Sequence, residues 1–324
     1  MLSYPWLEEP WQQLLTQKNN QRFPHALLLQ APDGMAHQEL LKQLAKLLLC
    51  EAPTPQGYCG QCHSCRLFEA GNHPDLLQLE PETKTIGVDV IRVLGERFAK
   101  RPTLGRAQVA LIESAGRLTE NAANALLKTL EEPVSDSYLF LHCQSRDQLL
   151  PTITSRCYQQ ILTAPAEAIT QKWLAQRLQH PPSMTELRLN QGLPLRVLRF
   201  CEKQGGEERK LIEAIGKLAD SPQQVMVIRD LIAEEFEERL NWLLYFIQDL
   251  QRYLLGCSSE SWVWQQAKAS VESLGKRSSL AKVQRHYHGL LELKRQARPG
   301  TLVNPKLQLM SWLSLFYEDC CSRR

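Results

Sequence analysis

The chain has no long apolar run and no strong excess of charge of either sign. Its 324 residues are 43% hydrophobic and 23% charged, and the formal net charge is only +3. No apolar stretch reaches the roughly 20 residues that a membrane span requires. The small net charge supplies no general basic field for tight nucleic-acid binding by this chain alone. These absences favour a soluble globular protein of two or three domains, and we expect no membrane contact.

We expect no secretion signal in the first residues. The segment MLSYPWLEEPWQQLL is amphipathic and acidic, without a basic region ahead of an apolar stretch. The chain nevertheless contains ten cysteines. Cysteines without a secretion signal indicate a reducing, cytoplasmic location, and they favour metal binding over disulfides.

The first half of the chain alternates short apolar segments with segments of helical spacing. The expected strands are His25–Gln30, Asp75–Glu80, Gln108–Glu113, Tyr138–Cys143 and Tyr158–Leu162, and the expected helices are Gln38–Leu49, Val88–Lys100 and Glu120–Glu131. This alternation predicts an α/β domain with a mainly parallel sheet that is covered on both faces.

The strand pattern stops at Ala164-Pro165, and the rest of the chain reads as helical. Helices are expected at Ala166–His180 and Met184–Asn190, from beyond the breaks at Gly192 and Pro194 to about Lys203, at Val225–Leu255 and Leu280–Arg298, and from Asn304-Pro305 to Phe316. The breaks predict three domains, at residues 1–163, 164–205 and 206–324.

Four cysteines are spaced as ligands of one metal ion. Cys50, Cys59, Cys62 and Cys65 form the pattern C-x8-C-x2-C-x2-C. Zn²⁺ takes four thiolates at tetrahedral corners, and an all-cysteine site has no open position for a substrate water, so we expect a structural zinc site. Buried or redox-active thiols and an iron–sulfur cluster are the alternatives. His63 lies within the cluster, and we expect it outside the ligand set.

The segment after the first strand resembles a phosphate-binding loop that has lost its chemistry. The pattern G-x-x-x-x-G-K-[ST] places Ala31 and Ala36 at its glycines, with Gly34 inside the turn, His37 at the lysine and Gln38 at the hydroxyl residue. A largely neutral imidazole cannot replace the lysine charge, and an amide is a poor Mg²⁺ ligand. An ordinary α/β domain that never bound nucleotide would look similar at this point.

A second catalytic element is also incomplete. The strand VALIE ends at Glu113, where an ATPase carries two adjacent acids, but the next residue is Ser114. One acid that could hold Mg²⁺ remains, whereas the acid that would orient the attacking water is absent.

Two further segments identify a family. LTENAANALLKTLEEP (118–133) and LPTITSRC (150–157) resemble the clamp-loader branch of the AAA+ proteins. With the cysteine module after the first helix, the chain is similar to subunits of the bacterial DNA polymerase III clamp loader. The resemblance implies a RecA-like α/β AAA+ domain that carries the zinc module, a small helical lid domain and an all-α C-terminal collar domain. It also implies a role in loading the sliding clamp onto primed DNA during replication, within the DNA polymerase III holoenzyme.

The same resemblance implies a subunit without ATPase activity of its own. The ATP-hydrolysing γ/τ subunits keep the residues that are lost here, and the δ subunit usually lacks the cysteine module and the S-R-C segment. Leu193 and Leu195 replace the serine and arginine of the G-S-x-R segment found in active members. We therefore expect no bound ATP, and we expect δ, γ/τ, the sliding clamp and primer–template DNA as partners in an assembled complex.

Two basic residues gain candidate roles from the resemblance. Arg156 of S-R-C matches the arginine that reaches into a neighbouring subunit's ATP site, where a guanidinium stabilises phosphoryl charge. Lys128 lies on a helix that carries DNA-facing basic residues in related loaders. A local salt bridge for Arg156 and a solvated position for Lys128 are the simpler alternatives.

Two rival functions remain open from the sequence. One is an ATP-hydrolysing γ/τ-type subunit of the same loader, which nucleotide binding would distinguish. The other is a stand-alone zinc protein that binds nucleic acid. Against the second, the cysteine segment is poor in basic residues, with only Arg66 beside it.

Overall fold

The computed structural model describes residues 3–79, 85–104, 106–203, 206–297 and 304–321. The chain forms two compact units. The first comprises Met1–Gln176 with Leu193–Arg196, and the second comprises Arg177–Gly192 with Val197–Arg324. None of the described helices combines the length and the apolar character that crossing a membrane would require.

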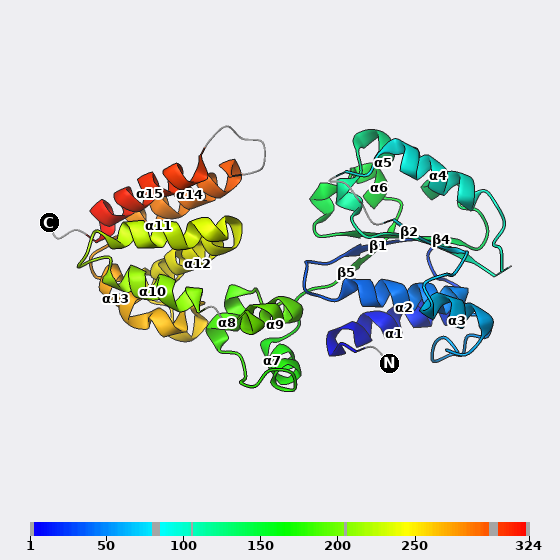
Figure 1. The fold of residues 1–324 in the computed structure, drawn as a ribbon, viewed down its shortest axis with the longest axis horizontal. Coiled ribbons are helices and arrows are strands. Elements are labelled where there is room, and N and C mark those ends of the chain that lie inside the picture. Colours follow the sequence, from blue (N-terminus) through cyan, green and yellow to red (C-terminus); the bar gives the residue numbers. More distant parts are fainter. Residues whose placement is uncertain (1–2, 80–84, 105, 204–205, 298–303, 322–324) are drawn as a thin grey trace. The chain divides into compact units, whose positions relative to one another are not determined.

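The first unit alternates strands and helices (Figure 1). Its strands are β1 (Ala26–Gln30), β2 (Leu76–Leu79), β3 (Gln108–Ile112), β4 (Ser137–Cys143) and β5 (Tyr158–Ile161). Its α-helices are α1 (Glu8–Asn19), α2 (His37–Leu49), α3 (His63–Glu69), α4 (Val88–Phe98), α5 (Glu120–Glu131), α6 (Pro151–Thr154) and α7 (Glu167–Ala175), with short 3-10 turns at Pro5–Leu7, Ala115–Arg117 and Arg146–Gln148.

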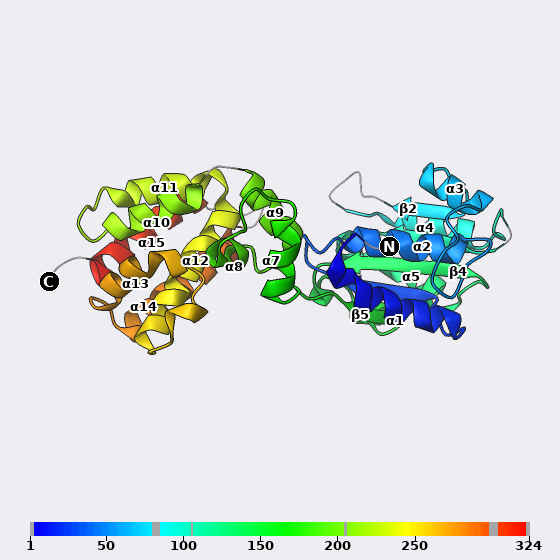
Figure 2. The same ribbon diagram turned by 90° about the horizontal axis from the view of Figure 1, so that it is seen from below.

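The five strands form one parallel sheet in the order β2-β3-β4-β1-β5. Helices α4, α5 and α6 cover one face, and α1 and α2 cover the other (Figures 1 and 2). All five residues of β3 are buried, as expected for a strand with helices on both sides. Because the strands are parallel, the carboxyl ends of β1, β3 and β4 meet at one edge of the sheet.

The strand predictions are confirmed to within one residue at each described end, and Glu80 lies outside the described residues. Two observations explain why α5 forms where the sequence predicted a helix. Thr119 caps α5 by accepting a hydrogen bond from the Ala122 N–H at 3.2 Å. Leu126 and Leu130 lie on the buried face of α5 and pack with Ile91 and Leu94 of α4 in the core above the sheet. Helix α3 was not predicted.

The second unit is helical throughout its described residues. It contains α8 (Met184–Leu189), most of α9 (Pro194–Glu202), α10 (Glu207–Lys217), α11 (Gln224–Glu234), α12 (Phe236–Leu254), α13 (Lys268–Gly275), α14 (Leu280–Gln296) and α15 (Pro305–Cys320), with 3-10 turns at Ser259–Ser261 and Gln265–Ala267. Its own buried core includes Phe246, Trp264 and Phe316. Asn304 caps α15 and Pro305 is the first helical residue, as expected, although the helix continues to Cys320.

One predicted helix is wrong as a single element. The segment Val225–Leu255 divides into α11 and α12 at Glu235, whose backbone is non-helical (φ −129°, ψ 68°). The buried Arg239 guanidinium donates to the Leu231 carbonyl at 2.6 Å and to Glu234 at 2.7 Å, which satisfies groups at the end of α11. The predicted three-domain division, with a separate lid at 164–205, stays a prediction.

Candidate functional site

The segment that resembles a phosphate-binding loop connects β1 to α2. Gly34 (φ +99°) and Ala36 (φ +55°) have left-handed backbones that turn the chain into the helix. The Leu195 N–H donates to the Gly34 carbonyl at 3.1 Å. A Cβ atom at Gly34 would lie 2.8 Å from Arg196 Cγ, so the Arg196 side chain packs directly on the loop. The strand, turn and helix are therefore present, and the region expected to carry a G-S-x-R segment lies against the turn.

The remaining acid of the site is held by amides. Gln38 Nε2 donates to Glu113 Oε2 at 2.6 Å, and Gln78 Nε2 donates to Glu113 Oε1 at 2.8 Å. Both carboxylate oxygens thus have protein donors, and Glu113 is buried. Oxygens engaged in this way are poorly available to a metal ion.

His37 is stacked on a second histidine that the sequence did not single out. The rings of His37 and His142 have centroids 3.6 Å apart and lie within 12° of parallel. Burial, and then the neighbouring His142, lower the pKa of His37 to about 3. The imidazole at the lysine position is therefore neutral at physiological pH, as expected.

His142 ties the ends of two strands together. Its Nδ1 lies 2.6 Å from the Glu113 carbonyl oxygen, and its Nε2 lies 3.0 Å from the Ala31 carbonyl oxygen. Both contacts are to backbone carbonyl oxygens, which accept hydrogen bonds. The cavity of about 370 Å³ at this edge is lined by Asp33, His37, Gln38, Glu113, Ser114, Gly116, Arg117, His142, Cys143, Gln144 and Gln148.

The four predicted cysteine ligands come together. The sulfur atoms of Cys50, Cys59, Cys62 and Cys65 all lie within 4.8 Å of one another, and those of Cys50 and Cys62 are 4.0 Å apart. A tetrahedral zinc site with Zn–S bonds of about 2.3 Å has sulfur–sulfur edges of about 3.8 Å. The set therefore fits one metal ion such as zinc, and His63 is not part of it.

Backbone N–H groups support the cysteine sulfurs. The N–H groups of Cys59, Cys62 and Cys65 donate to the preceding ligand in the set at 3.3, 3.3 and 3.4 Å. Hydrogen bonds from the backbone of Gln61 and Cys62 lower the pKa of the Cys59 thiol to about 6, whereas burial raises the pKa of Cys50 and Cys65. A cation is the group that would stabilise all four sulfurs as thiolates together.

The cysteine module is anchored to the sheet domain by a buried polar chain. Ser64 donates its hydroxyl to the Leu49 carbonyl at 2.6 Å, and its oxygen lies 2.8 Å from His73 Nε2. The Asp75 N–H then donates to His73 Nδ1 at 3.2 Å. This chain joins α2, α3 and the start of β2.

Arg156 lies on the surface beside the end of α5. Its Nη2 is 2.7 Å from Glu131 Oε1, and its Nη1 donates to the Thr152 carbonyl at 3.0 Å and to Ser155 Oγ at 3.4 Å. The side chain is 38% exposed. The local salt bridge considered from the sequence therefore exists, and the guanidinium is also accessible from outside.

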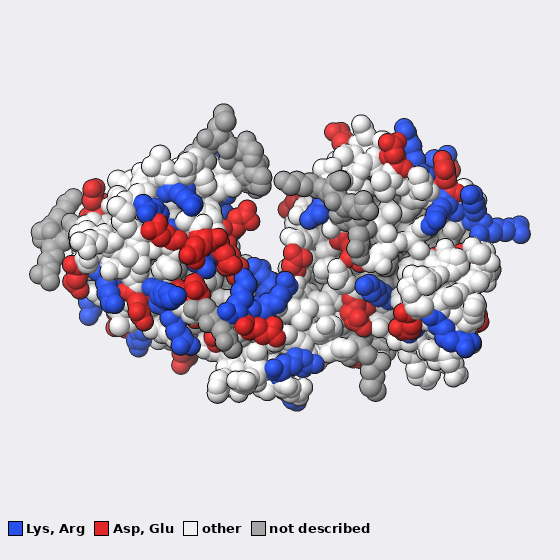
Figure 3. Space-filling model, viewed as in Figure 1, with Lys and Arg blue, Asp and Glu red and all other residues white. Residues whose placement is uncertain are grey.

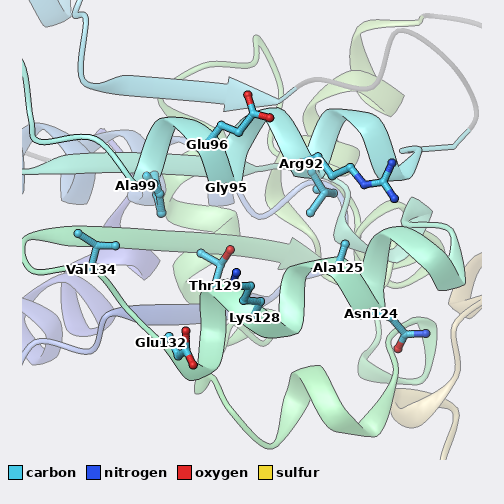
Figure 4. Close-up of a pocket in the computed structure, with 12 residues that line it drawn as sticks. Arg92, Gly95, Glu96, Ala99, Asn124, Ala125, Lys128, Thr129, Glu132 and Val134 are labelled. Atoms are coloured by element: carbon cyan, nitrogen blue, oxygen red, sulfur yellow. The ribbon is translucent and has the colours of Figure 1, made fainter.

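Lys128 is exposed on α5 at a groove between α4 and α5. Figure 4 shows Arg92 and Glu96 of α4 on one side of this groove, and Lys128 and Glu132 on the other. On the face seen in Figure 3, positive and negative side chains both occur over both units. The groove thus contains charges of both signs, and the location of Lys128 permits either a DNA contact or a solvated lysine.

Sequence reasoning missed His142, Gln78, Arg196 and Glu131 at these sites. Each contacts a predicted site residue, but none belongs to the motif that identified its partner. The register of β1 with β4, which pairs Leu29 with His142, brings His142 to this edge of the sheet, and the sequence alone gives no signal for it.

Comparison with known proteins gives consistent matches along the chain. A family model described as "DNA polymerase III, delta subunit" matches residues 6–166, and one described as "DNA polymerase III, delta subunit, C terminal" matches residues 206–317. DNA polymerase III subunit δ′ of Pseudomonas aeruginosa is 34% identical over 327 residues, covering 96% of this chain and 98% of the relative. Subunit δ′ of Escherichia coli K12 is 35% identical over 251 residues, covering 76% of this chain and 75% of the relative.

A solved structure of a DNA polymerase III γ subunit-related protein from Thermotoga maritima aligns over 94% of this chain and 99% of that chain. Its TM-score is 0.48 at 19% identity, a likeness too loose to support an inference about function.

Proposed function

The chain belongs to the family of DNA polymerase III δ′ subunits, and on that premise we propose that it is a clamp-loader subunit that completes a neighbour's ATPase site without hydrolysing ATP itself. Its partners would be the δ and γ/τ subunits, with the sliding clamp and primed DNA engaged through the assembled complex. Family membership supports the place in the complex, and the state of the degenerate loop supports the absence of activity in this chain.

The observation that carries the inactivity is the Gln38–Glu113–Gln78 arrangement. In an ATPase, the residue at position 38 would hold Mg²⁺ through a hydroxyl, and the acid at position 113 would assist. Here the two side chains satisfy each other at 2.6 Å, and Gln78 satisfies the other carboxylate oxygen. With a neutral His37 in place of the lysine, neither Mg²⁺ nor the phosphates have their usual partners.

We propose zinc as the metal of the cysteine module. The donor set consists of four sulfurs without a fifth group, which suits a closed structural site rather than a catalytic one. Zinc would fasten the end of α2 to α3, and no chemical step would pass through it.

Arg156 is the residue that we propose acts in trans. Its position on the surface and its planar, permanently charged group suit contact with a neighbour's phosphate oxygens. The test is an assembled loader that contains either the wild-type chain or Arg156→Ala, assayed for ATP turnover with clamp and primed DNA. An arginine finger contributes on the order of 10³ or more at its site, and bulk turnover falls less because other sites keep their own fingers.

Arg22→Ala is a matched control, because Arg22 is also an exposed arginine of the first unit but lies far along the chain from the S-R-C segment. Normal assembly with unchanged turnover by Arg156→Ala would show that Arg156 has only a structural role.

Lys128→Ala in the same loader tests the proposed DNA contact, since loss of one phosphate contact lowers the salt dependence of DNA binding by about one unit of slope. An unchanged slope would make Lys128 a solvated lysine.

A further inference from the structure

Glu131 and two other groups of the same chain surround the Arg156 guanidinium. Glu131 is the last residue of α5, and its Oε1 lies 2.7 Å from Arg156 Nη2. The other two groups, the Thr152 carbonyl and the Ser155 hydroxyl, belong to α6 and its end, and both accept from Nη1. The ends of two helices therefore fix the two terminal nitrogens of one planar group.

An exposed ion pair alone is a weak constraint, and here the side chains of Arg156 and Glu131 are 38% and 49% exposed. The convergence of three acceptors on one guanidinium distinguishes this contact from an isolated surface pair. A free arginine side chain has many rotamers, and fixing one of them upon association opposes binding. An arginine that is already fixed avoids this ordering step.

We propose that Glu131 is a positioning residue for Arg156, holding the guanidinium in the orientation in which it meets the neighbouring subunit's phosphates. The proposal rests on the proposed trans-acting role of Arg156. Glu131 engages Nη2 through one oxygen, and a guanidinium has five N–H groups, so donors remain for a phosphate.

Two opposite effects of the Glu131 charge need to be compared. Its negative charge opposes the approach of phosphate, and a unit charge at 4 Å in water changes an interaction by about fivefold. A misplacement of about 1 Å in a catalytic group can lower a rate by about 100-fold. Positioning is therefore the larger effect, and loss of Glu131 lowers turnover instead of raising it.

The experiment uses the assembled loader with clamp and primed DNA. Four variants of this chain are compared with the wild type: Glu131→Gln, Glu120→Gln, Arg156→Ala and the double variant Glu131→Gln/Arg156→Ala. Glu120 is the matched control, since it is an exposed glutamate at the opposite end of α5 that makes no ion pair with Arg156 among the described residues. Glu131→Gln should slow the affected site about two- to tenfold, as for losing one half-exposed charge-assisted hydrogen bond, so that bulk kcat falls less than it does in Arg156→Ala while KM for ATP stays unchanged. Glu120→Gln should match the wild type.

The double variant separates positioning from a general structural effect. If Glu131 acts through Arg156, Glu131→Gln adds no loss in the Arg156→Ala background, whereas an additive loss would overturn the proposal. Wild-type turnover by Glu131→Gln beside a defective Arg156→Ala would overturn the role of Glu131 alone. Wild-type turnover by Arg156→Ala would instead overturn the proposed function.

A second measurement does not depend on assembly. In the isolated chain, nuclear magnetic resonance relaxation of the Arg156 guanidinium should show greater motion in Glu131→Gln than in Glu120→Gln. Equal motion in the two variants would overturn the proposal.

Discussion

At the scale of single residues, the degenerate loop differs from an empty nucleotide site because the carboxylates of Glu113 and Asp33 are satisfied by amides of the same chain. Glu113 accepts from two amides, and Asp33 accepts from Gln144 at 2.6 Å. The isolated protein should therefore show no appreciable ATP binding by calorimetry in the presence of Mg²⁺. The assembled loader in the same buffer is the positive control. Micromolar binding by the isolated chain would favour the ATP-hydrolysing rival.

Because His37 is buried and its pKa is lowered, the free energy of unfolding should fall as the pH is lowered. Its pKa is about 3 in the folded chain and 6.5 in an unfolded chain, so the unfolded state binds more protons between these values. The contribution of His37 is fully present above pH 6.5 and is lost as the pH falls toward 3. Between pH 7 and 5 the wild type should lose about 2 kcal/mol more unfolding free energy than His37→Gln. Urea unfolding at several pH values measures this difference, and parallel losses would contradict it.

The sequence predicted which residues the loop lacks, but not what replaced their interactions. The loss of lysine and hydroxyl at positions 37 and 38 is readable because the motif fixes both positions. The partners of those residues, His142 and Glu113, lie more than 70 positions away along the chain. They arrive through the order and register of the sheet, which residue types alone do not determine.

At the scale of elements, the cysteine module depends on a few short contacts. Helix α3 has only seven residues, too few to be stable alone, and two of the ligands lie at or near its start. Purified protein should contain about one zinc per chain. Cys62→Ser should lose the metal and speed amide hydrogen exchange in α3, while Cys257→Ser, an exposed cysteine outside the set, should retain both properties. Absence of zinc, or iron with visible absorbance, would refute the assignment.

Element boundaries were predictable where apolar spacing and turn residues agreed. Strands β1 to β4 are short, mostly apolar runs between polar turns, and all five strands were found. The break at Glu235 was not predictable, because the apolar residues keep their helical spacing through it. The Arg239 side chain, which donates to the Leu231 carbonyl, satisfies the end of α11 at this break. Helix α3 was missed because its seven residues are too few to show a helical period, and the cysteines were interpreted as metal ligands on a turn.

At the scale of the whole molecule, each unit has a core of its own. The helical unit's core extends from Leu189 to Cys321 and includes residues before position 206. A fragment of residues 177–324 should therefore fold cooperatively, and a fragment of residues 206–324 should be less stable because it lacks Leu189. Thermal unfolding of the two fragments gives the comparison. Equal stability would support the predicted boundary at 206 over the boundary at 177.

The close packing of Arg196 on Gly34 affects how this sequence can diverge. A side chain at position 34 would meet the Arg196 stem at 2.8 Å on a backbone with φ +99°, so two separate constraints keep glycine there. Positions 37 and 38, which the proposed function frees from phosphate chemistry, are constrained by the ring stack of His37 and the hydrogen bond of Gln38. In lineages that descend from this chain, we expect the residues with lost chemical roles to drift while Gly34 persists. On the proposed function, Gly34 would then be retained for its backbone conformation and its packing, and not for catalysis.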